Sequence, residues 1–253
     1  MTTFRNPVVV IPARLAATRL PGKPMADISG APMIVHVWRR AVDAGVGPVM
    51  VACGDHQIAE AIRREGGIAV MTETGLPSGS DRVFEALREF DPDEKHDVVI
   101  NLQGDLPNIA GSAVAAVLEP LDDPAVDIAT LVAEITDPDE RDDPNVVKAV
   151  VGLQAGQTIG RALYFSRALV PTGAGPYYHH IGIYGYRRAA LARFVGLSPG
   201  ILEQRERLEQ LRALENGMRI DVAVVDTVPL GVDTPADLER ARALIAGGAA
   251  GPK

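Results

Sequence analysis

The first half of the chain alternates short apolar runs with stretches of helical periodicity, and this alternation limits the possible folds more than any other feature. Helical patterns occupy about residues 31–45, 55–67 and 80–90, with Gly45 expected to end the first and Ser80 to be the N-cap of the third. Such alternation is typical of βαβ units and a mostly parallel sheet. The apolar runs predict buried strands at residues 8–11, 48–53, 68–71 and 97–103.

The second half of the chain departs from this alternation. Its strand-like segments follow one another with little helix between them, which favours an antiparallel extension or a separate lobe. We further expect one long amphipathic helix over residues 201–217, a strand over 219–225, a final helix within 231–246 and a disordered tail over 247–253. The strand-like segments cover residues 127–135, 145–153, 161–166 and 179–187.

Composition excludes several classes of protein. With 253 residues and 47% hydrophobic content, the chain can bury a sizeable core. The net charge of -8 argues against a general nucleic-acid binder, which needs a broad basic surface. The single cysteine, Cys53, cannot form an intrachain disulfide and favours a reducing compartment. Neither a signal sequence nor a run of eighteen apolar residues is present, so we expect a cytoplasmic protein that does not span a membrane.

A cationic loop, IPARLAATRLPGKP at residues 11–24, follows the first predicted strand. It brings Arg14, Arg19 and Lys23 to the carboxyl end of a strand, where α/β sheets place ligands. The loop is not a P-loop, because Pro24 stands where Ser or Thr is required, and it lacks the three-glycine dinucleotide fingerprint. Side chains would therefore hold an anion, with arginine forks and a compact lysine charge meeting phosphate or carboxylate oxygens. The alternative is a solvated loop whose charges pair with surface carboxylates.

Two aspartates are expected at the same edge of the sheet. Asp105 follows the strand at 97–103, and Asp233 lies between the strand at 219–225 and the final helix. Two carboxylates opposite three cations suit Mg²⁺ and a polyphosphate, because Mg²⁺ prefers hard oxygen ligands and takes only one or two from protein. The alternative for Asp233 is an N-cap, since the sequence DTP precedes a helix.

The segment PSGSDR at residues 77–82 places Ser78 and Ser80 around a glycine at a helix start. Free backbone N–H groups there can meet a phosphate, a ribose or a base edge, although plain capping explains the serines equally well.

Two segments of the second half also carry polar side chains. In HHIGIYGYR, at 179–187, alternation predicts one polar strand face and one core face. Adjacent histidines are more often structural than catalytic, and no spacing here suggests zinc. In the long predicted helix, leucines face the core, so Glu209 and Gln210 point elsewhere, ordinarily to solvent. The predicted polar face carries His180, Gly182, Tyr184 and Tyr186, the core face Ile181, Ile183 and Gly185, and the helix leucines are Leu208, Leu211 and Leu214.

A series of segments follows along the chain: IPARLAATRLPGKP, PMIVHVWRRA, SGSDR, NLQGD, ALYFSRA, HIGIYGYR, LEQLRALENG and GVDTPADLERAR. In this order they resemble the 3-deoxy-manno-octulosonate (Kdo) cytidylyltransferase, or CMP-Kdo synthetase, family over about residues 8–246. The resemblance implies a Rossmann-like nucleotidyltransferase mixed α/β sheet flanked by helices, in one domain over 1–253, with a smaller sugar-binding and dimerisation lobe inserted at roughly 125–215. It also implies a homodimer that joins CTP and Kdo into CMP-Kdo, with release of pyrophosphate, for lipopolysaccharide synthesis.

The resemblance also implies roles for individual residues. Arg14 and Lys23 would hold the triphosphate, Arg19 would serve the phosphates or the Kdo carboxylate, and Asp105 with Asp233 would hold Mg²⁺. Cations and Mg²⁺ suit an in-line attack on the α-phosphorus without a covalent protein intermediate. The implied nucleotide-binding residues are Pro12, Ala13, Arg14, Lys23, Ser78, Gly79, Ser80, Arg82 and Gln103, and the implied sugar-binding residues are Arg19, His180, Tyr184, Glu209 and Gln210.

The sequence departs from the family pattern at several positions. Leu76 and Pro77 stand where the family often has His and Gln, Leu106 replaces the glutamate of QGDEP, and ACGD ends the second strand instead of ATD. A related reading is CMP-acylneuraminate synthetase, which shares the IPAR opening but whose loop usually continues to a Lys-Asn pair. A sugar-1-phosphate nucleotidyltransferase would show a GGxGTRL loop. A non-catalytic nucleotide-binding homologue is the alternative outside enzymes, and the retained charged residues argue against it.

Overall fold

The computed structural model describes residues 6–16 and 20–247, which fall into two compact units. Of the described residues, 6–16, 20–115 and 229–247 form the N-terminal unit, and 116–228 form the middle unit. Both units combine a sheet with helices, so the predicted mixed α/β class is confirmed. The lobe predicted at roughly 125–215 falls within the middle unit. Of the predicted tail, Gly247 caps the last helix and residues 248–253 lie outside the described part of the chain.

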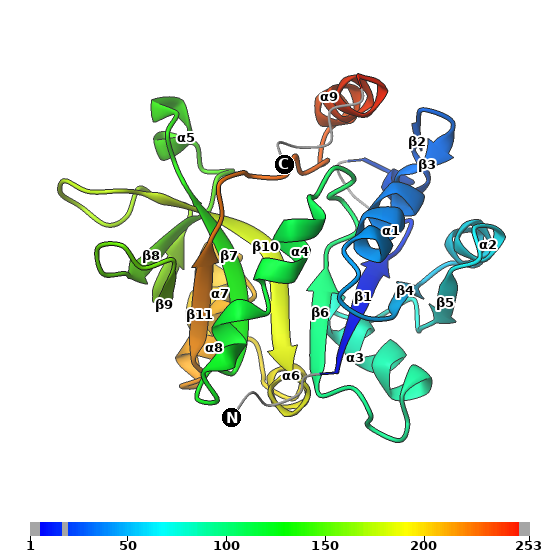
Figure 1. The fold of residues 1–253 in the computed structure, drawn as a ribbon, viewed down its shortest axis with the longest axis horizontal. Helices are drawn as coiled ribbons and strands as arrows, with labels where there is room; N and C mark the ends of the chain where they lie inside the picture. The colour runs from blue at the N-terminus through cyan, green and yellow to red at the C-terminus, as the bar shows by residue number, and fades with distance from the viewer. Residues whose placement is uncertain (1–5, 17–19, 248–253) are drawn as a thin grey trace. The chain divides into compact units, whose positions relative to one another are not determined.

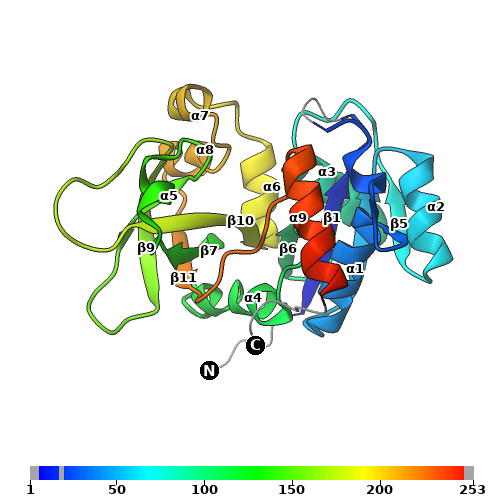
Figure 2. The ribbon, with the colours of Figure 1, turned by 90° about the horizontal axis from the view of Figure 1, so that it is seen from above.

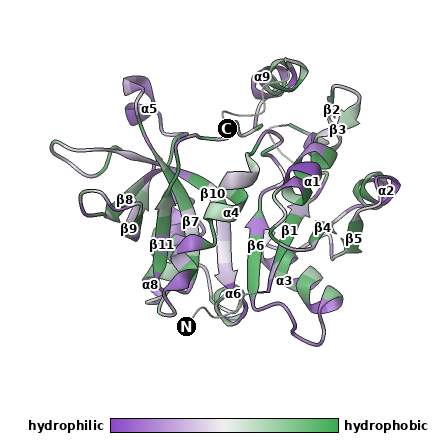
Figure 3. Ribbon diagram, in the orientation of Figure 1, coloured by the Kyte–Doolittle hydropathy of each residue, from purple (hydrophilic) through white to green (hydrophobic). Residues whose placement is uncertain are grey.

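Parallel strands in the order β5-β4-β1-β6 form the sheet of the N-terminal unit, drawn in blue and cyan in Figure 1. In the central strand, Val9 lies opposite both Val49 and Ile100. Every residue of β4 and β6 is buried, which is why both read as continuous apolar runs. Figure 3 shows β6 as a hydrophobic strand that turns hydrophilic toward its carboxyl end. The strands are β1 (Pro7–Ala13), β4 (Val49–Cys53), β5 (Ile68–Met71) and β6 (Val98–Leu102), with the hairpin β2 (Asp27–Ile28) and β3 (Ala31–Pro32) beside them.

Helices cover both faces of this sheet, because parallel neighbours need crossover connections. Figure 2 shows α1 and α3 on opposite sides of β1. Helix α1 buries Met33, Val37 and Ala41 at four-residue spacing, the pattern expected of one apolar stripe. The helices are η1 (Lys23–Met25), α1 (Met33–Asp43), α2 (His56–Arg64), α3 (Gly79–Phe90), α4 (Gly111–Ala116), which reaches the boundary of the unit, and α9 (Pro235–Ala246).

The N-cap of the third helix of this unit differs from the prediction. Helix α3 begins at Gly79, and its N-cap is Ser78, whose hydroxyl accepts a hydrogen bond from the amide of Asp81. Ser80 is therefore not the cap, and the prediction was wrong by two residues. Gly45 adopts a φ of 65° just beyond α1, as expected for a glycine that ends a helix.

The sheet of the middle unit is largely antiparallel, as predicted. Its strands follow the order β10-β7-β11-β9-β8, and β8 also pairs with β10, so the sheet curls back on itself. Only the pair β11–β7 is parallel among these described strands. The strands are β7 (Ile128–Glu134), β8 (Lys148–Gly152), β9 (Ile159–Ser166), β10 (Tyr178–Arg187) and β11 (Ile220–Val224).

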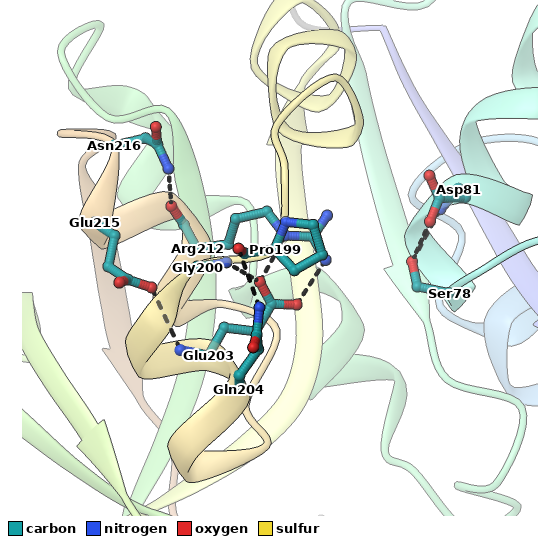
Figure 4. Close-up of polar contacts among 9 residues, drawn as sticks. All are labelled: Ser78, Asp81, Pro199, Gly200, Glu203, Gln204, Arg212, Glu215 and Asn216. Carbon is teal, nitrogen blue, oxygen red and sulfur yellow. Dashed lines mark hydrogen bonds and ion pairs between the residues drawn. The ribbon is translucent and has the colours of Figure 1, made fainter.

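The long helix predicted over 201–217 is broken in two. Arg207 ends α7 with a left-handed backbone (φ 58°), and a turn leads into α8. The guanidinium of Arg212 donates two hydrogen bonds, 2.8 and 2.6 Å, to the carboxylate of Glu203 and folds α8 back against α7 (Figure 4). The helices of this unit are η2 (Glu119–Asp122), α5 (Pro138–Asp142), α6 (Arg188–Val195), α7 (Ile201–Glu206) and α8 (Leu211–Glu215).

None of the helices in the described residues is long and apolar enough to cross a bilayer.

Candidate functional site

A cleft of about 350 Å³ opens in the N-terminal unit at the carboxyl ends of β1 and β6. Parallel α/β sheets bind ligands at this edge. Most residues assigned to the nucleotide line it, whereas the departures Leu76, Pro77 and Leu106 do not. The lining residues are Pro12, Ala13, Arg14, Ala16, Leu20, Lys23, Pro24, Ser78, Gly79, Arg82, Gln103, Gly104, Asp105 and Asp233.

Lys23 lies between the two predicted metal-binding carboxylates. Its Nζ donates to Asp105 Oδ2 at 3.0 Å and to Asp233 Oδ1 at 3.1 Å. Burial lowers the pKa of Lys23, but the two carboxylates outweigh this effect, so the pKa lies above its ordinary value. The ammonium therefore stays charged at neutral pH and neutralises the carboxylates.

Asp233 reaches the cleft by a route that the sequence did not predict. The strand before it, β11, ends at Val224 in the middle unit, so Asp233 does not lie at a strand end. Instead, the amide of Val232 donates to the carbonyl of Asp105 at 3.0 Å, which places the next residue beside that aspartate. Asp233 is not the N-cap either, because Thr234 accepts from the amide of Asp237 in a capping box. The side chain of Asp233 instead meets Lys23.

The cationic loop is anchored at its start by a carboxylate. Asp55 Oδ2 accepts a hydrogen bond from the amide of Leu15 at 2.7 Å. Arg14, the residue before, has an exposed side chain that borders the cleft, and it forms no ion pair with any described residue. Arg19 falls outside the described residues, so its predicted role stays a prediction. For Arg14, the alternative of a surface ion pair finds no support in the described part of the chain.

Arg82 places a buried cation in the wall of the cleft. It is only 2% exposed, and it donates to the hydroxyl of Thr72 and to the carbonyl of Thr74. Burial and the nearby charge of Arg14 lower its pKa, and no carboxylate of the described residues forms an ion pair with it. The nearby charges of Glu85 and Asp55 act in the opposite direction without reversing the shift, so an anionic ligand in the cleft would stabilise this buried cation.

Gly54 explains one departure from the family pattern. A Cβ at this position would lie 3.0 Å from Arg82 Nη1 and 3.2 Å from Arg14 Cβ. Such distances require the neighbouring side chains to shift. The glycine of ACGD therefore leaves room for both arginines.

The SGSDR segment contributes unequally to the cleft. Ser78 and Gly79 line it, and Ser78 also donates its hydroxyl to Asp81 Oδ2 at 2.7 Å, as Figure 4 shows. Ser80 is buried behind the wall, where it accepts from Asn101 at 3.4 Å, and does not line the cleft. Gln103 lines the cleft and donates Nε2 to Asn101 Oδ1 at 2.8 Å, which fixes its side chain.

The residues assigned to the sugar lie in the middle unit. The ring centroids of His180 and Tyr184 are 5.6 Å apart, and those of Tyr184 and Tyr186 are 5.9 Å apart. The three side chains therefore share one face of β10, as predicted. The face is not an open polar surface, however, because His180 and Tyr186 are both buried. An irregularity between Ile181 and Tyr184 inserts residues into β10 and leaves this side-chain face intact.

Glu209 and Gln210 follow the break between α7 and α8. Gln210 is 5% exposed, and its buried Nε2 has no hydrogen-bond partner among the described residues. The solvated-face interpretation was therefore wrong for Gln210, because the helix on which it depended is interrupted. Burial, then the neighbouring Tyr186 and then the charge of Glu209 raise the pKa of Tyr184 well above its ordinary value.

Sequence reasoning missed three residues that hold the site in place. Asp55 anchors the cationic loop, Asn101 holds Gln103, and Thr130 contacts His180 Nε2 at 3.0 Å. Asp55 stood out only as the start of a helix. Asn101 gave the weak signal of an amide inside an apolar strand, and Thr130 gave none.

Comparison with known proteins identifies relatives along nearly the whole chain. Residues 8–220 match the family model described as cytidylyltransferase. A 3-deoxy-manno-octulosonate cytidylyltransferase from Paramagnetospirillum magneticum is 66% identical over 240 residues, which cover 95% of this chain and 98% of that protein. The protein of the same name from Rhodospirillum rubrum is 64% identical, over 94% of this chain and 95% of its own length.

A solved structure resembles the fold closely. A CMP:2-keto-3-deoxy-manno-octonic acid synthetase in complex with CTP superposes with a TM-score of 0.87 at 42% sequence identity. The match covers 96% of this chain and 100% of that one.

Proposed function

Because this chain belongs to the 3-deoxy-manno-octulosonate cytidylyltransferase family, we propose that it joins CTP and Kdo to give CMP-Kdo and pyrophosphate. CMP-Kdo is the activated sugar for lipopolysaccharide synthesis. The observation that carries the proposal is the charge arrangement of the cleft. Three cationic side chains and two carboxylates meet at the ligand-binding edge of the sheet, as a triphosphate and its metal ion require: Arg14, Lys23, Arg82, Asp105 and Asp233.

Mg²⁺ is part of this proposal, and the residues present fit it. Oxygens of Asp105 and Asp233 converge on one point, now held by Lys23 Nζ. Two carboxylates are enough for Mg²⁺, which takes one or two from protein and completes its shell with phosphates and water. Bound there, Mg²⁺ would neutralise charge on the triphosphate.

The protein's own side chains position the reacting groups. In the proposed reaction, the anomeric hydroxyl oxygen of Kdo bonds to the α-phosphorus as the bond from that phosphorus to the β-phosphate oxygen breaks. Pyrophosphate leaves, and the hydroxyl proton passes to solvent. Lys23, which keeps its charge, and the buried Arg82 supply fixed positive charge, and Arg14 borders the same cleft. No covalent protein intermediate is needed.

We assign Kdo to the polar side chains of the middle unit. His180, Tyr184, Glu209 and Gln210 combine aromatic surface with hydrogen-bonding groups. The buried Nε2 of Gln210 is a donor that a sugar hydroxyl or carboxylate could satisfy. The role of Arg19 toward Kdo remains part of the same prediction.

We also propose a homodimer formed through the middle unit. Leu163 on β9 is 57% exposed and Ile201 at the start of α7 is 74% exposed. Large apolar side chains at the surface are candidates for burial in an isologous contact. A monomer by light scattering at micromolar concentration would contradict this assignment. A cytoplasmic location, where CTP is made, completes the proposal.

Pyrophosphate release tests the proposed reaction. Purified protein with CTP and Mg²⁺ should release pyrophosphate when Kdo is added, and should stop when EDTA is present. Equal turnover with an acylneuraminate would argue for the related synthetase instead. Binding of CTP without turnover on any sugar acid would indicate the non-catalytic homologue.

A further inference from the structure

Thr130 lies beneath His180 at the irregularity of β10. It is a residue of β7 with no exposed surface, and in the sheet it lies opposite Tyr184. The register of β10 shifts between Ile181 and Tyr184, so the backbone there leaves the regular ladder. The hydroxyl of Thr130 therefore faces the backbone carbonyl groups of this irregular stretch.

Three contacts converge on the Thr130 hydroxyl. Its Oγ1 lies 2.8 Å from the carbonyl oxygen of Ile183, 3.2 Å from that of Ile181 and 3.0 Å from His180 Nε2. Carbonyl oxygens can only accept, and the hydroxyl has one proton. Once that proton is donated to a carbonyl, the contact with Nε2 is a hydrogen bond only if Nε2 carries a proton and donates it to Oγ1.

We infer that Thr130 is a positioning residue, which holds His180 in the tautomer protonated on Nε2 and leaves Nδ1 as the acceptor for a sugar hydroxyl. The inference rests on the proposed assignment of His180 to the Kdo pocket. His180 Nδ1 forms no hydrogen bond with any residue in the described ranges. A polyhydroxylated sugar acid offers the donors that such a nitrogen accepts.

The surroundings of His180 favour the neutral ring. Burial, together with the charge of His179, lowers the pKa of His180 to about 3. Nearby charges do not reverse this, because the carboxylate of Glu140 pairs with His179 at 3.4 Å. The ring centroids of Phe165 and His180 are 4.8 Å apart with their planes 64° apart, and Tyr184 packs against His180 as well, so the ring has a fixed orientation. A neutral, oriented imidazole has one donor nitrogen and one acceptor nitrogen, and the contact with Thr130 makes Nε2 the donor and Nδ1 the acceptor.

The tautomer can be read in the free protein, without substrate. Long-range proton–nitrogen NMR of protein with ¹⁵N-labelled histidine distinguishes a protonated from an unprotonated ring nitrogen, and His180→Gln identifies the relevant signals. The wild type and Thr130→Ser, which keeps the hydroxyl, should show a neutral ring with the proton on Nε2. Thr130→Val, which keeps the shape, should lose this single tautomer. Ser166→Ala, which removes another buried hydroxyl of the middle unit, should leave it unchanged.

Steady-state kinetics give the functional readout. Thr130→Val should raise the KM for Kdo by about tenfold, the effect of one lost or misdirected hydrogen bond, with the KM for CTP unchanged and with recovery in Thr130→Ser. A wild-type spectrum with the proton on Nδ1 would overturn the inference, as would a Thr130→Val variant with unchanged tautomer and unchanged KM. If the wild type fails to use Kdo, the proposed function fails, and the free-protein spectrum still decides the role of Thr130. If Thr130→Val does not fold, the wild-type and Thr130→Ser spectra decide it.

Discussion

Replacement of Lys23 by methionine should destabilise the metal-free protein, because it leaves two carboxylates facing each other. Each carboxylate oxygen lies about 3 Å from Nζ, so the two are at most about 6 Å apart. The carboxylates repel each other in the wild type as well, so the energy lost is the attraction of the two ion pairs of Lys23, about 0.2–1 kcal/mol for each partly exposed pair. Because Asp105 and Asp233 are 31% and 44% exposed, we expect a loss of about 1–2 kcal/mol, which corresponds to about 2–8 °C in melting temperature.

Magnesium ions should reverse this loss selectively. In the wild type Mg²⁺ must displace the ammonium from the carboxylates, whereas in Lys23→Met the pair is uncompensated. Scanning calorimetry without nucleotide, at constant ionic strength, should therefore show that Mg²⁺ raises the melting temperature of Lys23→Met more than that of the wild type. At a hundred times its dissociation constant a ligand adds about 2.7 kcal/mol, enough to restore the variant fully.

A matched control separates this effect from the loss of any surface lysine. Lys95 pairs with Asp93 at 2.9 Å, and both side chains are 71% exposed. Lys95→Met should change stability by less than about 1 kcal/mol and should not respond to Mg²⁺. The reasoning is refuted if Lys23→Met is as stable as the wild type without metal, or if Mg²⁺ shifts both melting temperatures equally.

Four further substitutions separate other roles. Asp233→Asn should change stability by less than about 1 kcal/mol yet weaken the Mg²⁺ dependence of turnover sharply. Thr234→Ala should cost about 1 kcal/mol of stability through the lost N-cap and keep the Mg²⁺ dependence. Thermal melts and Mg²⁺ titrations of turnover check both variants. Arg82→Met should weaken CTP binding, measured by calorimetric titration. Its melting temperature should be kept or raised, because the buried charge forms no ion pair with a carboxylate in the described part of the chain. Unchanged affinity would exclude an anion site there. The pKa of His180 is lowered from 6.5 to about 3, so as pH falls the unfolded chain binds the proton before the folded protein does. His180 should therefore reduce the stability of the wild type as pH falls from about 6.5 toward 3, and His180→Gln should lose less stability over that range. Parallel curves of stability against pH for the two proteins would contradict this.

The sequence predicted the N-terminal unit well, because β4 and β6 are buried along their whole length and β1 along most of it. Continuous apolar runs such as β6 cannot be mistaken for amphipathic segments, and their order along the chain determines a parallel sheet. The middle unit was harder. The spacing of Leu208 and Leu211 correctly predicted two buried side chains, yet the helix breaks at Arg207 and is folded back by the Glu203–Arg212 ion pair, a contact that no periodicity reveals.

From the sequence alone, only the cleft residues that directly follow strands could be placed. Arg14 and Asp105 follow strands of one sheet and therefore meet at one edge. Asp233 arrives instead through a backbone hydrogen bond of Val232, and Asp55 and Thr130 act through single long-range hydrogen bonds. Such contacts join residues far apart in the chain, and a single sequence has no pattern that records them.

The central claim is that this chain transfers a cytidylyl group from CTP to Kdo. Its most direct test is pyrophosphate release by the purified protein, followed with CTP and Mg²⁺ in the presence of Kdo, of an acylneuraminate or of no sugar acid. The account predicts release with Kdo, little with acylneuraminate, none without a sugar acid, and an equal yield of CMP-Kdo and pyrophosphate. Release that does not depend on Kdo, or equal turnover with acylneuraminate, would contradict it.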